Sequence, residues 1–285
     1  MPAVGYLSPR SLAEALEALG SGKAWILAGG TDFYPGLGDR PAPLDVLDIS
    51  RVEGLRGIER TEGGWRIGAA TTWTDVVCAT LPPCFDGLKA AAREVGSIQI
   101  QNTGTVAGNL CNASPAADGV PPLLTLTAAV ELASANGLRV VPLAEFITGV
   151  RRTARRPNEL VTAVIVPGQA ATARSAFLKL GSRAYLVISI AMVAVVTVPD
   201  DAGRIAEARV AVGACSPVAR RLPALERALR GLPLVGDAAS AAVRAEHLAP
   251  LTPIDDIRGS AGYRLQAVQV LLRRALAAPA TELAA

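Results

Sequence analysis

Histidine, cysteine and aromatic residues are scarce in this chain. Of its 285 residues one is histidine (His247), four are cysteine and 4% are aromatic. Cys78, Cys84, Cys111 and Cys215 form no Cys-x-x-Cys pair, so zinc-ribbon and ferredoxin-type cluster motifs are missing and isolated reduced thiols are expected. A single histidine argues against a histidine-based zinc site or a Ser–His–Asp triad. We therefore expect neither a metal site nor a hydrolytic triad.

Strong net charge and long hydrophobic runs are also lacking. The formal net charge is +3 at pH 7 with 19% charged residues, which is too mild to indicate nucleic-acid binding. The most apolar stretch, residues 186–198, is too short to cross a bilayer and has the β-branched content of a buried strand. The chain opens without a charged-then-apolar leader. These features predict a folded cytoplasmic protein with no membrane span.

Arginine is concentrated at one place. Arg151, Arg152, Arg155 and Arg156 stand just before Pro157, whereas most other basic residues are scattered singly. We interpret this cluster as a solvated turn, and the alternative is a patch that binds a partner or a phosphate.

The order of expected elements indicates an α+β protein. A strand–helix–strand unit opens the chain, with Ser8 as the expected helix cap. A second unit from residue 58 combines helices and strands up to a boundary at Pro167-Gly168. Beyond it, strands near 175–180, 187–198 and 204–212 precede helices near 223–229, 237–248 and 262–276, which predicts an antiparallel sheet with helices on one face. The expected domains are 1–168, with subdomains near 1–57 and 58–168, and 169–285.

Two polar segments are candidates for ligand binding. Residues 28–32 read Ala-Gly-Gly-Thr-Asp after a short strand, where glycines permit close approach and successive N–H groups can hold an anion. The loop is neither a Gly-x-Gly-x-x-Gly nor a Walker motif, and alone it is equally consistent with a tight turn. Residues 96–118 are poor in charge and rich in Gly, Asn and Thr; we interpret them as a long functional loop with donors for a phosphate, the alternative being polar turns.

Several segments together resemble the FAD-binding medium subunit of the xanthine dehydrogenase and carbon monoxide dehydrogenase family of molybdenum hydroxylases. In order, they are residues 29–32, 67–72, 96–118, 179–183 and 256–264. The most specific part is Thr-x-x-Gly-Asn-Leu-x-Asn-x-x-Pro-x-x-Asp, from Thr105 to Asp118. The resemblance spans nearly the whole chain and implies a two-subdomain FAD-binding domain of the vanillyl-alcohol-oxidase-like type, followed by the C-terminal α+β domain.

The resemblance also implies which residues bind FAD. The loop around the pyrophosphate is Ile26, Leu27, Ala28, Gly29, Gly30, Thr31, Asp32 and Phe33, and the loop that completes it includes Thr105, Ala107, Gly108 and Asn109. Asp118 matches a carboxylate that contacts the flavin nucleotide, Val161 an apolar contact near the isoalloxazine, and Lys179 a basic contact that would stabilise the reduced ring. No catalytic side chain is assigned.

The chain departs from the family pattern at several positions. Ala107 stands where relatives have a glycine, and Val95 aligns with an aromatic residue that lies against the flavin in xanthine dehydrogenase. Leu186 occupies an often acidic position, so no nicotinamide site is carried over. The cysteine-bearing insertion of some relatives is missing, and we expect no iron–sulfur cluster in this chain.

By resemblance, the chain passes electrons through FAD to an external acceptor. They come from a [2Fe-2S] small subunit after substrate oxidation in a molybdopterin-binding large subunit. One alternative is a self-contained flavin-dependent reductase, with Ser182 or Tyr185 as proton donor. Another is a non-enzymatic assembly module that has lost flavin. The substrate, the acceptor and the stoichiometry stay open at this point.

Overall fold

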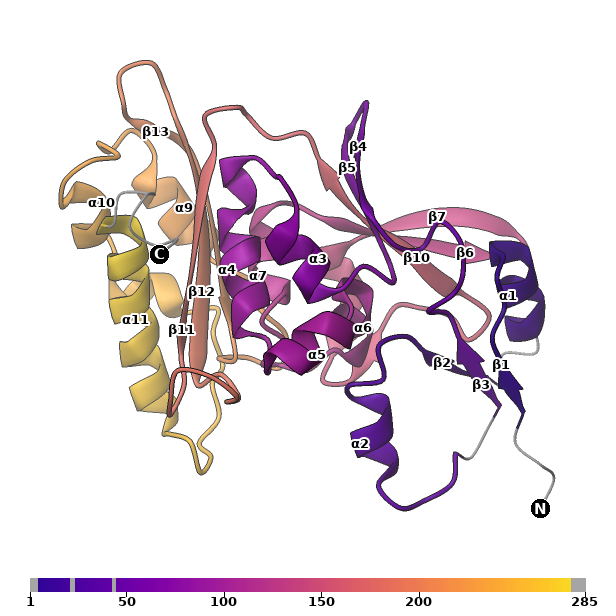
Figure 1. Ribbon diagram of the computed structural model, residues 1–285. Helices are drawn as coiled ribbons and strands as arrows, with labels where there is room; N and C mark the ends of the chain where they lie inside the picture. Colours follow the sequence, from indigo (N-terminus) through magenta and orange to yellow (C-terminus); the bar gives the residue numbers. More distant parts are fainter. Residues whose placement is uncertain (1–4, 21–23, 43–44, 278–285) are drawn as a thin grey trace.

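The chain builds its sheets one after another along the molecule (Figure 1). The computed structural model describes residues 5–20, 24–42 and 45–277. In this part of the chain a three-stranded, a five-stranded and a four-stranded sheet follow in sequence order, beside a small two-stranded one. Helices from the middle of the chain fill the space between the larger sheets (Figure 1).

The N-terminal unit is a small parallel sheet with a helix beside it. Its elements are β1 (Tyr6–Leu7), α1 (Leu12–Leu19), β2 (Trp25–Leu27), α2 (Phe33–Leu37) and β3 (Val46–Asp48), with strand order β1-β3-β2. The expected cap Ser8 was wrong. Ser11 caps α1, because its hydroxyl accepts the Glu14 N–H while the Glu14 carboxylate accepts the Ser11 N–H, a capping box for which Ser8 lacks the glutamate.

The middle sheet is antiparallel and carries the largest core. Its strands are β4 (Ile58–Thr61), β5 (Gly64–Gly68), β6 (Ala129–Ser134), β7 (Gly137–Pro142) and β10 (Leu160–Pro167), in the order β4-β5-β10-β6-β7. Ile67, Val130 and Val164 are fully buried in one cluster with Trp73 and Phe85. This apolar face positions the helices that follow β5 along the chain.

Short helices replace most of the long loop expected at residues 96–118. The middle helices are α3 (Trp73–Cys78), η1 (Pro83–Phe85), α4 (Asp86–Glu94), α5 (Ile98–Thr103), α6 (Val106–Asn112), α7 (Val120–Thr125) and α8 (Leu143–Phe146). The loop interpretation was wrong because Ser97 and Thr105 are helix caps, whose hydroxyls accept the N–H groups of Ile100 and Gly108. Leu110 then buries its side chain completely. Polar residues at caps made the segment look like a loop.

The C-terminal sheet is buried on both faces. Its strands are β11 (Arg174–Leu180), β12 (Ala191–Pro199), β13 (Ile205–Gly213) and β14 (Arg220–Arg221), all antiparallel. The helices α9 (Pro223–Leu229) and α11 (Ala261–Ala277) cover one face, and α4 and α7 cover the other (Figure 1). Val195 accordingly belongs to the α9–α11 core and its neighbour Val196 to the middle core. The expectation of helices on one face missed the second layer.

Two further boundaries differ from expectation. The strand expected from residue 187 begins at Ala191. The Ile190 carbonyl accepts a hydrogen bond from the buried Arg264 guanidinium at 2.6 Å and is therefore not free to pair with a neighbouring strand. The helix expected at 237–248 is divided into α10 (Ala238–Ala241) and the 3-10 turn η2 (Ala245–Leu248). Between them the Val243 carbonyl accepts hydrogen bonds from Gln269 and Arg273 of α11 instead of continuing the helix.

The last element to describe is a small hairpin between the middle helices and β10. The strands β8 (Ile147–Gly149) and β9 (Arg152–Thr153) pair with each other just before β10. Among the described helices, none pairs the length with the apolar character that crossing a membrane requires. In the same part of the chain, no three His, Cys, Asp or Glu side chains gather closely enough to hold a metal ion.

Candidate functional site

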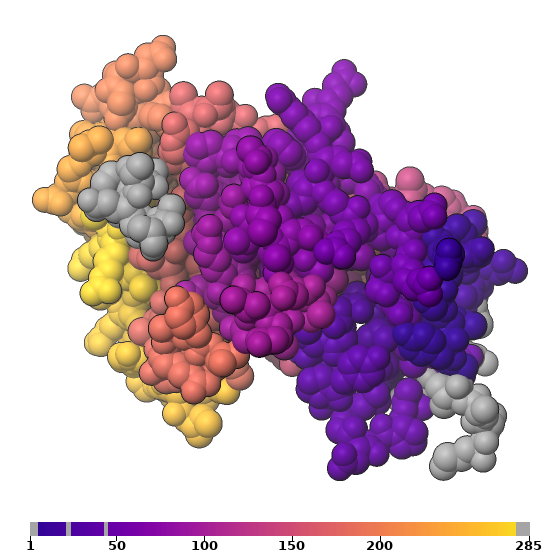
Figure 2. Space-filling view, viewed as in Figure 1, coloured from indigo at the N-terminus to yellow at the C-terminus, as the bar shows by residue number. Residues whose placement is uncertain are grey.

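A large cavity lies where the N-terminal unit meets the middle helices. It has a volume of about 680 Å³, and its lining includes Trp25, Ile26, residues 28–33, parts of α5 and α6, Arg151, Thr153, Arg155 and the start of β10. In Figure 2 the indigo N-terminal region lies directly against the segments around residue 100. This volume is in the range of cofactor pockets.

The glycine loop at the end of β2 forms one wall. A Cβ on Gly29 would lie 1.8 Å from the Thr103 carbonyl oxygen, and Gly30 has a φ of +74°, so each position requires glycine. Among the described residues, no protein acceptor takes the backbone N–H groups of residues 29–32. Successive free N–H groups beside a cavity form an anion-binding concavity.

The start of α6 forms the opposite wall. Thr105 caps this helix and accepts the Gly108 N–H at 3.0 Å, while Thr105 itself bridges to Thr72. Ala107, at a glycine position of the resemblance, buries its methyl group in the middle core and still lines the cavity. The Asn109 Oδ1 atom is buried without a hydrogen-bond partner among the described residues. An unpaired buried amide oxygen is expensive unless a ligand satisfies it.

Most of the residues predicted from the sequence meet in this cavity. Its lining includes Ile26, Ala28, Gly29, Gly30, Thr31, Asp32, Phe33, Val95, Thr105, Ala107, Gly108, Asn109 and Val161. Leu27, Asp118 and Lys179 are not part of the lining. Leu27 is a core residue that is 4% exposed.

Asp118 and Lys179 instead form a buried ion pair with each other. The Lys179 Nζ donates to Asp118 Oδ2 at 2.8 Å and to the Glu94 carbonyl, and the Ser189 hydroxyl donates to Asp118 Oδ1 at 2.6 Å. The side chains of Lys179 and Asp118 are only 5% and 10% exposed. Burial raises the pKa of Asp118, and the neighbouring Lys179 ammonium opposes that rise. The network ties the C-terminal sheet to the loop before α7.

The structure adds cavity residues that sequence reasoning did not select. They are Trp25, Ile49, Ala69, Trp73, Ile100, Gly104, Cys111, Asn112, Arg151, Thr153, Arg155 and Leu160. The arginine cluster was a usable signal, but we interpreted it as a solvated turn. Arg151, Arg152 and Arg156 are exposed, as that interpretation expects, but Arg151 also lines the cavity together with the half-buried Arg155.

Cys111 contributes a thiol to the cavity wall. Its side chain is open to the cavity, and the surrounding protein raises the pKa of the thiol to about 11. The group is therefore a neutral thiol at physiological pH and a poor nucleophile.

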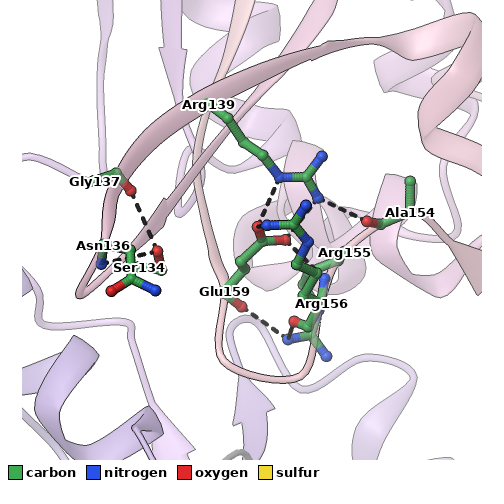
Figure 3. Close-up of polar contacts among 8 residues, drawn as sticks. All are labelled: Ser134, Asn136, Gly137, Arg139, Ala154, Arg155, Arg156 and Glu159. Atoms are coloured by element: carbon green, nitrogen blue, oxygen red, sulfur yellow. Dashed lines mark hydrogen bonds and ion pairs between the residues drawn. The ribbon is translucent and has the colours of Figure 1, made fainter.

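A charged cluster anchors the chain between the arginines and β10. Glu159 has a side chain that is 4% exposed, and it accepts two hydrogen bonds from Arg139 at 2.6 and 2.7 Å and one from the Arg156 N–H at 2.7 Å (Figure 3). The hydrogen bond from Arg139 lowers the pKa of Glu159. Arg139 also donates to the Ala154 carbonyl at 2.8 Å. The cluster thus fixes residues 154–159 directly beside the cavity.

Comparison with known proteins agrees with a flavoprotein built from these parts. Residues 2–169 match the family model described as the FAD binding domain in molybdopterin dehydrogenase, and residues 176–278 match the CO dehydrogenase flavoprotein C-terminal domain. The nicotinate dehydrogenase FAD-subunit of Eubacterium barkeri is 33% identical, over 94% of this chain and 93% of that protein. The carbon monoxide dehydrogenase medium chain of Hydrogenophaga pseudoflava is 30% identical, over 96% of each chain.

Solved structures show the same likeness. A chain of carbon monoxide dehydrogenase from Hydrogenophaga pseudoflava superposes with a TM-score of 0.86 at 31% identity, covering 96% of both chains. Quinoline 2-oxidoreductase from Pseudomonas putida 86 gives a TM-score of 0.86 at 28% identity, again over 96% of both. The fold and the matched families define a flavoprotein subunit of an oxidoreductase. The chain belongs to the FAD-binding medium subunits of the molybdenum hydroxylase family, and FAD is its cofactor.

Proposed function

We propose that FAD lies in the 680 Å³ cavity with its diphosphate between the glycine loop and the start of α6. The observation that carries this placement is the free N–H groups of residues 29–32, beside two glycines that leave no side chain in the way. The buried and unpaired Asn109 Oδ1 supplies an acceptor for a ligand hydroxyl or N–H. The residues present therefore fit a dinucleotide.

The protein's own residues bind, orient and shield the cofactor. Bound FAD would supply the conversion between two-electron and one-electron transfer. Val95 and Val161 both line the cavity and give it apolar surface for a ring system. Lys179, held by Asp118, places a buried positive charge near Val95 through its contact with the Glu94 carbonyl. Such a charge favours an anionic reduced ring.

We propose that the two-subdomain arrangement is of the vanillyl-alcohol-oxidase-like type. The supporting features are the separate parallel and antiparallel sheets on either side of the cavity. We place the FAD-binding domain at residues 1–168, with subdomains meeting near residue 57, and the C-terminal domain at 169–285. The start of β4 at Ile58 and the end of β10 at Pro167 support these divisions.

The relatives and the cysteines support a proposal for the partners and the compartment. We propose that a molybdopterin-binding large subunit and a [2Fe-2S] small subunit deliver electrons to this chain, and that an external acceptor removes them. Relatives named as subunits or medium chains match this chain along almost their whole length, which supports the assembly. Four unpaired cysteines support a reducing compartment, which we take to be the cytoplasm.

The assembled complex provides the test. The flavin is first removed from the complex. Reduction of the external acceptor by substrate is then measured, and, in a separate assay, reduction of an artificial dye that accepts electrons from the iron–sulfur subunit. We expect FAD removal to abolish the first activity and spare the second, and added FAD to restore the first at one FAD per chain. A complex that reduces its external acceptor equally well without flavin would refute the electron-transfer role.

A further inference from the structure

The lining of the cavity carries an unbalanced positive charge. Among the described residues that line the cavity, three are charged: Asp32, Arg151 and Arg155. Asp32 belongs to the glycine loop that we assign to the diphosphate of FAD. A carboxylate at that place repels an anion, so binding there requires compensating positive charge.

Arg151, whose side chain is largely exposed, lies beside the glycine loop. Its Nη1 atom lies 3.8 Å from Asp32 Oδ1 and donates to the Asn112 side chain, so the guanidinium bridges the N-terminal unit and α6. The residue holds a left-handed φ of +56°, and its N–H donates to the Ala113 carbonyl at 2.9 Å. A non-glycine residue in this conformation is strained, and such strain is retained where the surroundings fix it and often serves a function.

Arg155 is held in place by hydrogen bonds to the backbone of residues 156–159. Its Nη1 atom donates to the carbonyls of Arg156, Pro157 and Glu159, the last at 2.8 Å (Figure 3). The side chain is half-buried and lines the cavity. Because Glu159 also fixes the Arg156 N–H, the backbone that carries Arg155 is held in one conformation. A cation with a fixed position loses little entropy when it binds an anion.

We propose that Arg151 and Arg155 are the cationic half of the FAD diphosphate site, facing the N–H groups of residues 29–32. Arg151 neutralises Asp32 and attracts the diphosphate, and Arg155 adds the second guanidinium. Planar guanidinium groups are well suited to phosphate oxygens. This inference rests on the proposed placement of FAD and adds the residues that determine its affinity.

The test measures FAD affinity in the flavin-depleted complex, by flavin fluorescence, across a range of salt concentrations. The variants are Arg151→Asn, since asparagine tolerates the left-handed backbone, and Arg155→Gln. The matched control is Arg152→Gln, which removes the same charge from an exposed neighbour outside the cavity lining. We expect each cavity variant to weaken FAD binding about 10-fold to 100-fold, and the control to change it less than about twofold.

Salt dependence distinguishes a phosphate contact from a structural role. The dissociation constant of the wild type should rise with salt, and this rise should be shallower in both cavity variants because a screened attraction has been removed. Adding Asp32→Asn to Arg151→Asn should restore part of the affinity. Wild-type affinity in both variants, or weaker binding with an unchanged salt dependence, would overturn the inference. A wild-type complex that binds no FAD would instead refute the placement of the cofactor itself.

Discussion

Gly29 is where the glycine loop touches α5, and the contact leaves no room for a side chain. The first atom of any side chain there would lie 1.8 Å from the Thr103 carbonyl oxygen. We predict that Gly29→Ala displaces the loop, lowers stability by about 1–3 kcal/mol and reduces FAD retention. Desalting followed by flavin absorption measures retention, and urea unfolding measures stability.

A matched glycine separates this effect from the substitution itself. Gly36 lies in α2 of the same unit and has no atom within 4 Å of a built Cβ. We expect Gly36→Ala to retain FAD fully and to match or slightly exceed wild-type stability, because alanine favours a helix. Equal behaviour of the two variants would show that the close approach of Gly29 is not required.

Cys111 offers a chemical probe of the same cavity. Its thiol lines the cavity with a pKa of about 11, so we expect iodoacetamide to alkylate it slowly, at a rate that depends on access to the cavity. With FAD at ten times its dissociation constant, the alkylation rate at Cys111 should fall about tenfold. Cys78 is exposed elsewhere and should be unaffected. Peptide mass spectrometry follows both sites, and equal rates with and without FAD would place the cofactor elsewhere.

At the scale of elements, the segment between β9 and β10 depends on one buried carboxylate. Glu159 holds Arg139 and the Arg156 N–H, and its pKa is lowered below its ordinary value of 4.5 by the hydrogen bond from Arg139. A group with a lowered pKa in the folded state stabilises the fold above its unfolded pKa. That contribution is lost as the pH falls through the folded pKa.

We therefore predict a pH-dependent effect of Glu159→Gln. Near neutral pH the variant should lose about 1–3 kcal/mol of unfolding free energy, because charge-assisted hydrogen bonds from Arg139 are weakened. As the pH falls below about 4.5, the ordinary pKa that Glu159 has in the unfolded chain, the difference between the two proteins should begin to shrink, and it should vanish below the lowered pKa of the folded state. Urea unfolding at several pH values measures it, and a difference that stays constant on acidification would contradict the assigned role.

At the scale of the whole molecule, one ion pair joins the two halves of the chain. Asp118 precedes α7, whereas Lys179 and Ser189 belong to the C-terminal region, and all three side chains are largely buried. Removing one member of a buried pair leaves an uncompensated charge. We predict that Lys179→Met lowers the unfolding free energy by about 3 kcal/mol.

A second substitution tests that explanation. Adding Asp118→Asn to Lys179→Met removes the charge left behind, and the double variant should recover about 1 kcal/mol or more relative to Lys179→Met alone. A double variant that is no more stable than Lys179→Met alone, measured by urea unfolding with circular dichroism, would contradict the explanation.

The sequence determined the local elements and the family. Apolar runs and turn residues predicted the short strand before residue 28, the strands near 175–180 and 204–212 and the helix near 223–229, which the structure has as β2, β11, β13 and α9. The string from Thr105 to Asp118 carried the likeness to FAD-binding medium subunits that the comparisons confirmed. Such features depend on neighbouring residues, so they can be recognised from the chain alone. The cap at Ser11 and the helices α5 and α6 were missed because cap residues also favour turns.

Only the tertiary structure decided which residues share the cavity. Arg151 and Arg155 lie more than a hundred residues from Gly29 in the sequence but line the same cavity, and Asp118 and Lys179 bind each other outside its lining. The second helical layer on the C-terminal sheet likewise comes from α4 and α7, far earlier in the chain. Long-range contacts of this kind leave no periodic signal in a single sequence, because they depend on how separate cores pack together.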